Sequence, residues 1–140
     1  MARADKYTPI TEKREYYSDF LINFDENPIT GNLARVTNEE SVKQSIRNLV
    51  LTNRSERLFQ PLAGSRINSL LFENFDSSLV SSIETEIRET ISLYEPRANI
   101  ERVNITESQI DNNSLEITIL FSIINIPQII EMTLFLKRVR

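Results

Sequence analysis

The sequence contains no cysteine and no histidine, and these two absences exclude much catalytic chemistry. Without cysteine there is no disulfide, no thiolate nucleophile and no cysteine-ligated metal cluster. Without histidine the chain lacks the Ser-His-Asp triad, the commonest metal ligand and the usual proton shuttle at neutral pH. Glycine occurs only 2 times, too seldom for a glycine-rich phosphate loop. The composition therefore predicts no cofactor and disfavours most enzyme classes.

Long apolar runs are also missing. Residues 1–20 carry charges throughout, and polar residues interrupt the apolar-rich region 115–136. We therefore expect neither a signal peptide nor a membrane contact. The net charge of −4 argues against a general nucleic-acid binder. No closely spaced acidic pattern of the calcium-loop type is present, so no metal site is predicted.

What is present suffices for one domain. The chain has 140 residues, of which 40% are hydrophobic and 26% charged. Residues 1–18 are polar and without periodicity, and we predict an N-terminal arm that orders only against a partner. A frayed terminus is the alternative. Residues 19–140 are predicted to form the single domain.

Hydrophobic periodicity predicts a first helix after a small hairpin. Residues 20–24 and 33–36 are short apolar segments separated by turn signals. Thr37 followed by Glu40 is the pattern of a capping box. Apolar residues from Val42 to Val50 then share one helical face, and the helix is expected to end near residue 51 or 52.

A second and stronger helical stripe runs from Val80 to Tyr94. Asp76 or Ser77 is expected to cap this helix, and Pro96 is expected to end it by removing a backbone donor. A short helical or turn segment at residues 67–72 precedes it.

The remaining chain has the pattern of strands. Apolar residues alternate in residues 100–106, 115–123 and 129–139, with a turn at residues 111–114. The prediction is an α+β fold: a two-layer domain in which two main helices pack on a mainly antiparallel sheet, with a C-terminal three-stranded meander.

Charge is distributed unevenly along the chain. Residues 35–66 contain six basic and three acidic side chains, whereas residues 73–95 contain six acidic and one basic. Solvated helix faces are one interpretation of this pattern. Complementary docking among several protein partners is the other.

Two polar motifs are candidates for recognition. Glu95 and Arg97 flank Pro96, and residues two apart in an extended segment point the same way. We interpret them as a prong, a protruding pair of charged side chains that binds a partner and that the fold does not need. An internal Glu–Arg pair is the alternative. Glu56 and Arg57 begin an apolar loop, which is typical of interface centres, unless it is only a solvated connector.

The final predicted strand is the third candidate. Its apolar face contains Ile130, Met132 and Leu134. If this strand lies at the edge of the sheet, its free backbone groups can pair with a strand from another protein. Covering by the segment at residues 20–24 is the alternative.

Carboxylates are the only acid–base groups left for catalysis. A glycosidase needs two of them across a sugar-sized cleft, with one pKa raised by its surroundings. Glu73 and Asp76 lie close in sequence, but Asp76 is better explained as a helix cap. A cell-wall glycan hydrolase therefore stays the alternative function.

Several segments in order resemble one family. They are residues 27–33, residues 42–52, Ser55 to Arg57 with Pro61 and Gly64, residues 70–73, Tyr94 to Arg97 and the strand around Val103. Their order and spacing resemble the lysozyme-like-named small baseplate wedge proteins of contractile phage tails, which are related to the sheath-initiating baseplate component of type VI secretion systems. Ser55 departs from the glycine usual in that family, and Tyr94 from the frequent tryptophan.

The resemblance implies a structural, non-enzymatic virion protein of the tail baseplate, assembled in the host cytoplasm. It implies docking on the helical core bundle of other wedge proteins and a platform for the first ring of tail sheath protein, and it leaves contacts with tail tube or hub proteins open. A generic cytosolic adaptor would share the fold without this motif order. The candidate partner-binding residues are Glu95, Pro96, Arg97, Glu56, Arg57, Ile130, Met132 and Leu134.

Overall fold

The computed structural model describes residues 14–108 and 114–137. The elements are β1 (Ser18–Phe20), β2 (Arg35–Thr37), α1 (Asn38–Leu51), α2 (Ile67–Leu70), α3 (Ser77–Tyr94), β3 (Ala98–Glu107), β4 (Ser114–Ile123) and β5 (Ile126–Lys137). Strands β3, β4 and β5 form an antiparallel sheet in that order, and β1 pairs with β2 in a separate antiparallel ribbon. The predicted α+β class with a C-terminal meander is confirmed.

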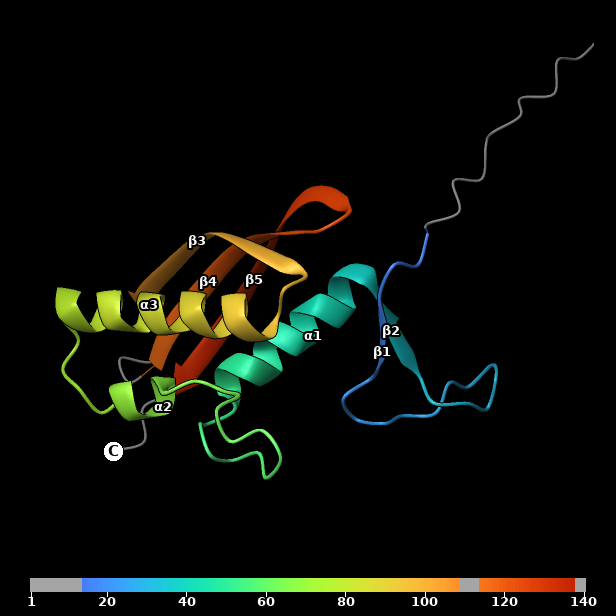
Figure 1. Cartoon of the computed structure of the whole chain (residues 1–140), viewed down its shortest axis with the longest axis horizontal. Coiled ribbons are helices and arrows are strands. Elements are labelled where there is room, and N and C mark those ends of the chain that lie inside the picture. The colour runs from blue at the N-terminus through green and yellow to red at the C-terminus, as the bar shows by residue number, and fades with distance from the viewer. Residues whose placement is uncertain (1–13, 109–113, 138–140) are drawn as a thin grey trace, which may run out of the picture.

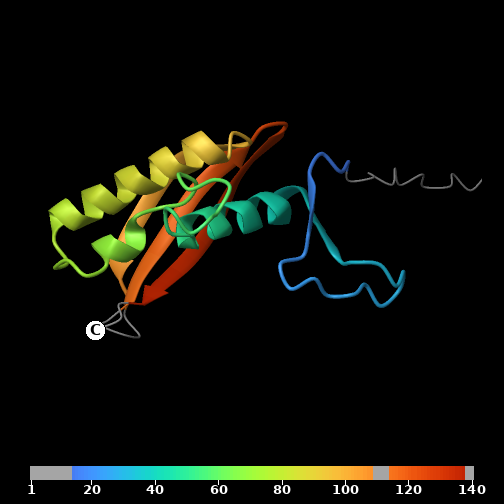
Figure 2. The same cartoon turned by 60° about the horizontal axis from the view of Figure 1, so that its bottom comes forward.

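The helices cover one face of the three-stranded sheet. Helix α3 lies along this face and α1 lies near β5, whereas the β1–β2 ribbon stands beyond the N-terminal end of α1 (Figures 1 and 2). Among the described residues, no helix is long and apolar enough to span a membrane.

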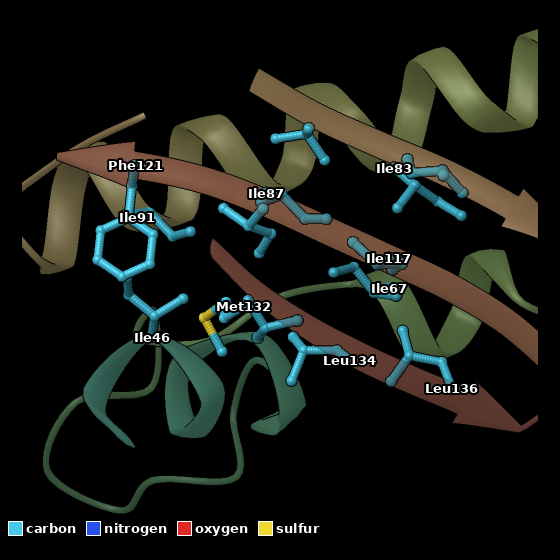
Figure 3. Packing of buried hydrophobic residues seen from close by; sticks show 14 of the residues in the cluster. Ile46, Ile67, Ile83, Ile87, Ile91, Ile117, Phe121, Met132, Leu134 and Leu136 are labelled. Atoms are coloured by element: carbon cyan, nitrogen blue, oxygen red, sulfur yellow. The ribbon is translucent and has the colours of Figure 1, made fainter. Parts of the chain in front are cut away.

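The core lies between the helices and the sheet, as the alternating pattern predicts (Figure 3). Alternate side chains of β4 point toward the helices and are fully buried, whereas their neighbours face the open side of the sheet. Ile83, Ile87 and Ile91 of α3 pack on them from above, and Ile46 of α1 completes the layer. Burying each such side chain stabilises the fold by about 1.5–3 kcal/mol.

The two main helices begin differently. Asp76 caps α3, and its carboxylate accepts a hydrogen bond from Leu79 N at 2.8 Å, as predicted. The capping box predicted for α1 is wrong, because the Thr37 side chain makes no cap hydrogen bond. The Glu40 carboxylate lies 3.5 Å from Lys43 Nζ, one turn along the helix.

Asn38 ties the N-terminal segment to the start of α1. Its backbone is left-handed, with φ of 48°. Its side-chain oxygen accepts from Tyr16 N at 2.8 Å and Tyr17 N at 3.3 Å, and its Nδ2 donates to Arg14 O at 2.9 Å. Residues 14–18 of the predicted arm therefore contact the domain, whereas residues 1–13 lie outside the described residues.

The predicted strand at residues 20–24 is wrong. Strand β1 ends at Phe20, and the chain then turns, with Phe24 N donating to Leu21 O at 2.9 Å. Strand β1 pairs with β2 and does not cover β5. The turn predicted at residues 111–114 and the end of the last predicted strand fall largely outside the described residues.

Candidate partner-binding surfaces

The 95–97 turn follows directly on α3. The Glu95 N–H continues the helical pattern by donating to Ile91 O at 2.8 Å, and the Glu95 carbonyl accepts from Ala98 N at 3.1 Å. These bonds fold the chain back so that Glu95 is only 2% exposed. Arg97 donates to both carboxylate oxygens, at 2.5 and 2.7 Å. The exposed-prong interpretation is therefore wrong for Glu95, which belongs to an internal ion pair.

The surroundings of this pair favour its charged form. Burial raises the pKa of Glu95, but hydrogen bonds from Arg97 and Ser45, together with the Arg97 charge, outweigh burial and hold it below its ordinary value of 4.5. The hydrogen bonds to Glu95 raise the pKa of Arg97, although burial opposes them. A carboxylate held ionised in this way is a structural anchor and a poor general acid.

The outer side of the turn is formed by Pro96, Arg97 and Tyr17. Pro96 is exposed and Arg97 half-buried. The Arg97 guanidinium lies 5.3 Å from the centroid of the Tyr17 ring, and the Tyr17 hydroxyl donates to Ile124 O at 3.2 Å. This surface therefore combines the end of α3, the β4–β5 hairpin and the N-terminal segment.

Glu56 and Arg57 lie in the 53–65 loop between α1 and α2. The Glu56 carboxylate accepts from Asn53 N at 2.8 Å, which makes it part of the loop's own structure. Arg57 is exposed and forms no ion pair within residues 14–108 and 114–137. Ser55 has φ of 70°, the left-handed region, which accounts for the glycine that the family resemblance predicts there.

The tip of the 53–65 loop is apolar and exposed. Leu58, Phe59 and Leu62 are 90%, 97% and 73% exposed. The base of the same loop is buried, because Ala63, Gly64 and Ser65 pack against the domain. The predicted apolar surface beside Arg57 is therefore present.

Much of the uneven charge is neutralised within the molecule. Glu86 of α3 is 3% exposed, and its carboxylate accepts from Arg54 at 2.9 Å and from Arg66 at 3.1 Å. Sequence reasoning missed this site. The available signal was a carboxylate adjacent to Ile87 on the buried stripe of a helix that follows a basic loop.

The alternation of backbone hydrogen bonds along each strand shows which residues of β5 point to the outer edge of the sheet. We refer to this odd–even alternation as the parity. Ser108 N donates to Ser114 O at 2.8 Å, so even-numbered residues of β4 bond to β3. In an antiparallel ladder the bonding direction alternates, so odd-numbered residues of β4 bond to β5. Leu115 faces Leu136 and Ile119 faces Met132. Even-numbered residues of β5 therefore bond inward to β4, and odd-numbered residues point their backbone groups to the outer edge.

This parity corrects the third candidate site. Ile130, Met132 and Leu134 use their backbone groups inside the sheet and bury their side chains in the core. Their apolar alternation marks the core face of the strand and not its edge. The outward backbone groups belong to Glu131, Thr133 and Phe135, and no strand of the described chain pairs with them.

A hollow of about 430 Å³ lies beside this edge. Its walls come from α1, from β5 and from the segment after β1. Its lining includes Lys43 and Arg47 of α1 and Glu131 and Thr133 of β5. A chain that paired with β5 would thus meet charged side chains on one flank.

Three acidic residues of the described chain are engaged in contacts within the fold. Asp76 is engaged in the α3 cap, Glu86 in two arginine contacts and Glu95 in its pair with Arg97. Over the part of the chain that the structure describes, no group of three or more acidic side chains could hold a metal ion.

Comparison with known proteins matches a family over most of these elements. Residues 36–128 match the family described as baseplate wedge protein gp25. The baseplate wedge protein gp25 of Enterobacteria phage T4 is 32% identical over 91 residues, which are 65% of this chain and 68% of that protein.

Solved structures share the fold. A structure named as a tail lysozyme from Geobacter sulfurreducens has a TM-score of 0.68 at 24% identity, over 73% of this chain and 92% of that chain. A chain of the anti-feeding prophage baseplate has a TM-score of 0.62 at 23% identity, over 85% and 83%. A chain of the postcontracted pyocin R2 baseplate has a TM-score of 0.52 at 14% identity, over 81% and 97%.

Proposed function

This chain belongs to the baseplate wedge protein gp25 family, and from that membership we propose that it is a non-enzymatic subunit of a contractile-tail baseplate that joins other wedge proteins and initiates the tail sheath. The observation that carries the proposal is the unpaired outer edge of β5 beside a charged hollow. Such an edge in a virion protein is a ready template for a strand of another subunit.

The sheath-initiating part rests on the backbone groups of Glu131, Thr133 and Phe135. A strand from a sheath subunit would gain its affinity from hydrogen bonds to these three residues. The side chains of the same residues lie on the open face of the sheet, where they would contact alternate side chains of the added strand.

The wedge-docking part rests on the outer side of the 95–97 turn. Pro96 and Arg97 are accessible there, whereas Glu95 supports Arg97 from inside. Glu95 is thus a positioning residue, and Arg97 is the charged group that an acidic partner would meet. The Tyr17 ring, 5.3 Å from the guanidinium, and the two hydrogen bonds to Glu95 help to hold Arg97 in place, which lowers the entropy cost of binding.

The non-enzymatic part rests on the carboxylates. A glycan hydrolase needs a carboxyl group whose pKa is raised, and the pKa of Glu95 is lowered. The alternative of a cell-wall hydrolase is supported only by the name of one fold neighbour. We expect purified protein to leave peptidoglycan intact, and hydrolysis that disappears in Glu73→Gln or Glu95→Gln would contradict this.

Thr133→Pro tests the sheath template. Proline removes the Thr133 N–H, which points outward, so the β4–β5 ladder keeps its bonds and we expect the variant to fold. Thr133→Val is the matched control, because it keeps the N–H and the branched shape. We expect baseplates with Thr133→Pro to contain the subunit but to carry no extended sheath, and those with Thr133→Val to carry normal sheath. Normal sheath on both would refute the template.

A further inference from the structure

We propose that the tip of the 53–65 loop is an anchor that inserts into an apolar groove with an acidic rim on another wedge protein. The proposal rests on the function above, because it requires the chain to be built into a baseplate. It assigns the binding energy to Leu58, Phe59 and Leu62, which lie in a different part of the chain from the 95–97 turn.

The loop is held rigidly although its tip is exposed. Ser55 N donates to Pro61 O at 2.6 Å across the loop, and the Tyr94 hydroxyl of α3 donates to Leu62 O at 2.8 Å. At the base, Ser65 N donates to Thr52 O at 2.8 Å. These bonds hold the loop backbone in place before any partner arrives, so less backbone entropy remains to be lost on binding.

The side chains of the tip are not part of the hydrophobic core of the described chain. The buried part of the connection is its base, where Ala63 and Ile67 are each 1% exposed. Leu58, Phe59 and Leu62 expose three large apolar side chains within one short loop, whereas single scattered ones are normal on a surface. Rigid, protruding apolar side chains of this kind are typical of residues that dominate an interface.

The charges around the tip select the partner. Three arginines lie in or beside the loop, Arg54, Arg57 and Arg66, and two of them, Arg54 and Arg66, share the carboxylate of Glu86. Arg57, at the tip, is exposed and forms no ion pair within the described residues. A groove that receives Phe59 would therefore bring an acidic group to Arg57.

A hollow of about 390 Å³ beside the tip extends the same surface. It is lined by Arg57 and Gln60 of the loop, by Leu93 and Tyr94 at the end of α3, and by residues of α1 and β1. The exposed Leu93 adds a fourth apolar side chain at its rim. A partner wall that accepts the tip would thus also place a side chain in this hollow and reach toward the 95–97 turn.

Site-specific photo-crosslinking in assembled tails tests the identity of the partner. A photoreactive phenylalanine analogue replaces Phe59, and in a matched control it replaces Ile29, which is 92% exposed but lies between β1 and β2. We expect the probe at residue 59 to crosslink to another wedge protein, at an apolar segment flanked by Asp or Glu, and the probe at residue 29 not to give that product. The proposal would be overturned if the probe at residue 59 crosslinked to a second copy of this chain or to the sheath protein. It would also be overturned if this probe gave no crosslinked product.

Substitutions test the energetic claim. Phe59→Ser and Leu58→Ser are expected to lower the number of copies per purified baseplate by about tenfold, and Arg57→Glu by about fivefold, with unchanged melting temperatures. Ile29→Ser is expected to incorporate normally. Normal incorporation of Phe59→Ser and Leu58→Ser would overturn the anchor. Absence of the wild-type protein from purified baseplates would instead overturn the proposed function, so the two failures are distinguishable.

Discussion

The guanidinium of Arg97 lies 5.3 Å from the centroid of the Tyr17 ring, which joins two segments 80 residues apart in the chain. Tyr17 also bonds to the β4–β5 hairpin through its hydroxyl, at 3.2 Å from Ile124 O. The N-terminal segment therefore supports the surface that we propose for wedge docking.

Removing the Tyr17 ring is expected to weaken the fold moderately. Tyr17→Leu deletes the cation–π contact and the hydrogen bond, and we expect the free energy of unfolding to fall by about 1–2 kcal/mol in urea titrations. Tyr17→Phe keeps the ring and loses only an exposed hydrogen bond, so it is expected to cost about 0.5 kcal/mol. Equal losses in both variants would contradict a contribution from the ring.

The ionisation of Glu95 is expected to make the free energy of unfolding depend on pH in the acidic range. Its pKa in the folded protein lies below 4.5, so its contribution is fully present above pH 4.5 and is lost as the pH falls through the folded pKa. Glu95→Gln leaves Arg97 half-buried without its partner and is expected to cost about 3 kcal/mol at pH 7. The variant should also show a smaller loss of stability between pH 5 and pH 3, as measured by urea unfolding at each pH.

The matched control for this prediction is Glu84→Gln. Glu84 pairs with Arg88 at 3.0 Å on the accessible side of α3. A surface pair of this type contributes about 0.5 kcal/mol or less. If Glu95→Gln cost as little as Glu84→Gln, the 95–97 turn would be the exposed prong that its sequence suggests.

Glu86 is expected to be the most sensitive carboxylate of α3. Glu86→Gln removes the charge that Arg54 and Arg66 share and leaves a buried amide facing two cations, at an expected cost of about 2–4 kcal/mol in urea unfolding. Glu89→Gln, on the exposed side of the same helix, is the control and should change stability by less than about 0.5 kcal/mol. A small effect of Glu86→Gln would mean that water solvates Arg54 and Arg66 when the carboxylate is absent.

The two ends of the 53–65 loop are expected to respond to glycine in opposite ways. Ser55→Gly relieves a left-handed φ of 70° and should raise the free energy of unfolding by about 0.5–1 kcal/mol. Gly64 has φ of 130°, and in Gly64→Ala the added Cβ would lie 2.6 Å from Thr52 O. We therefore expect this variant to lower the free energy of unfolding by more than about 2 kcal/mol. Thermal melting of both variants checks these signs, and a destabilising Ser55→Gly would contradict the strain at residue 55.

Local sequence patterns determined where most helices and strands lie in the chain. The helical stripe from Val80 to Tyr94, the cap at Asp76 and the alternation in β4 each follow from the nearest neighbours in the chain, and the structure confirms them. The family could also be recognised from the sequence, because the order of short motifs is itself a property of the chain. The absence of a cofactor, a metal site and a catalytic role, which composition indicates, stays a prediction, since composition counts side chains without giving their positions.

Only the tertiary structure decided which polar groups are buried and which edge is free. Glu86 and Glu95 are buried beside partners from distant parts of the chain, which are Arg54 and Arg66 for Glu86 and Ser45 for Glu95. The alternation of β5 marks its core face, but the direction of its outward backbone groups follows from the register with β4. These properties arise from pairs of residues distant in sequence, and a local pattern contains no information about which distant partner will fill each position.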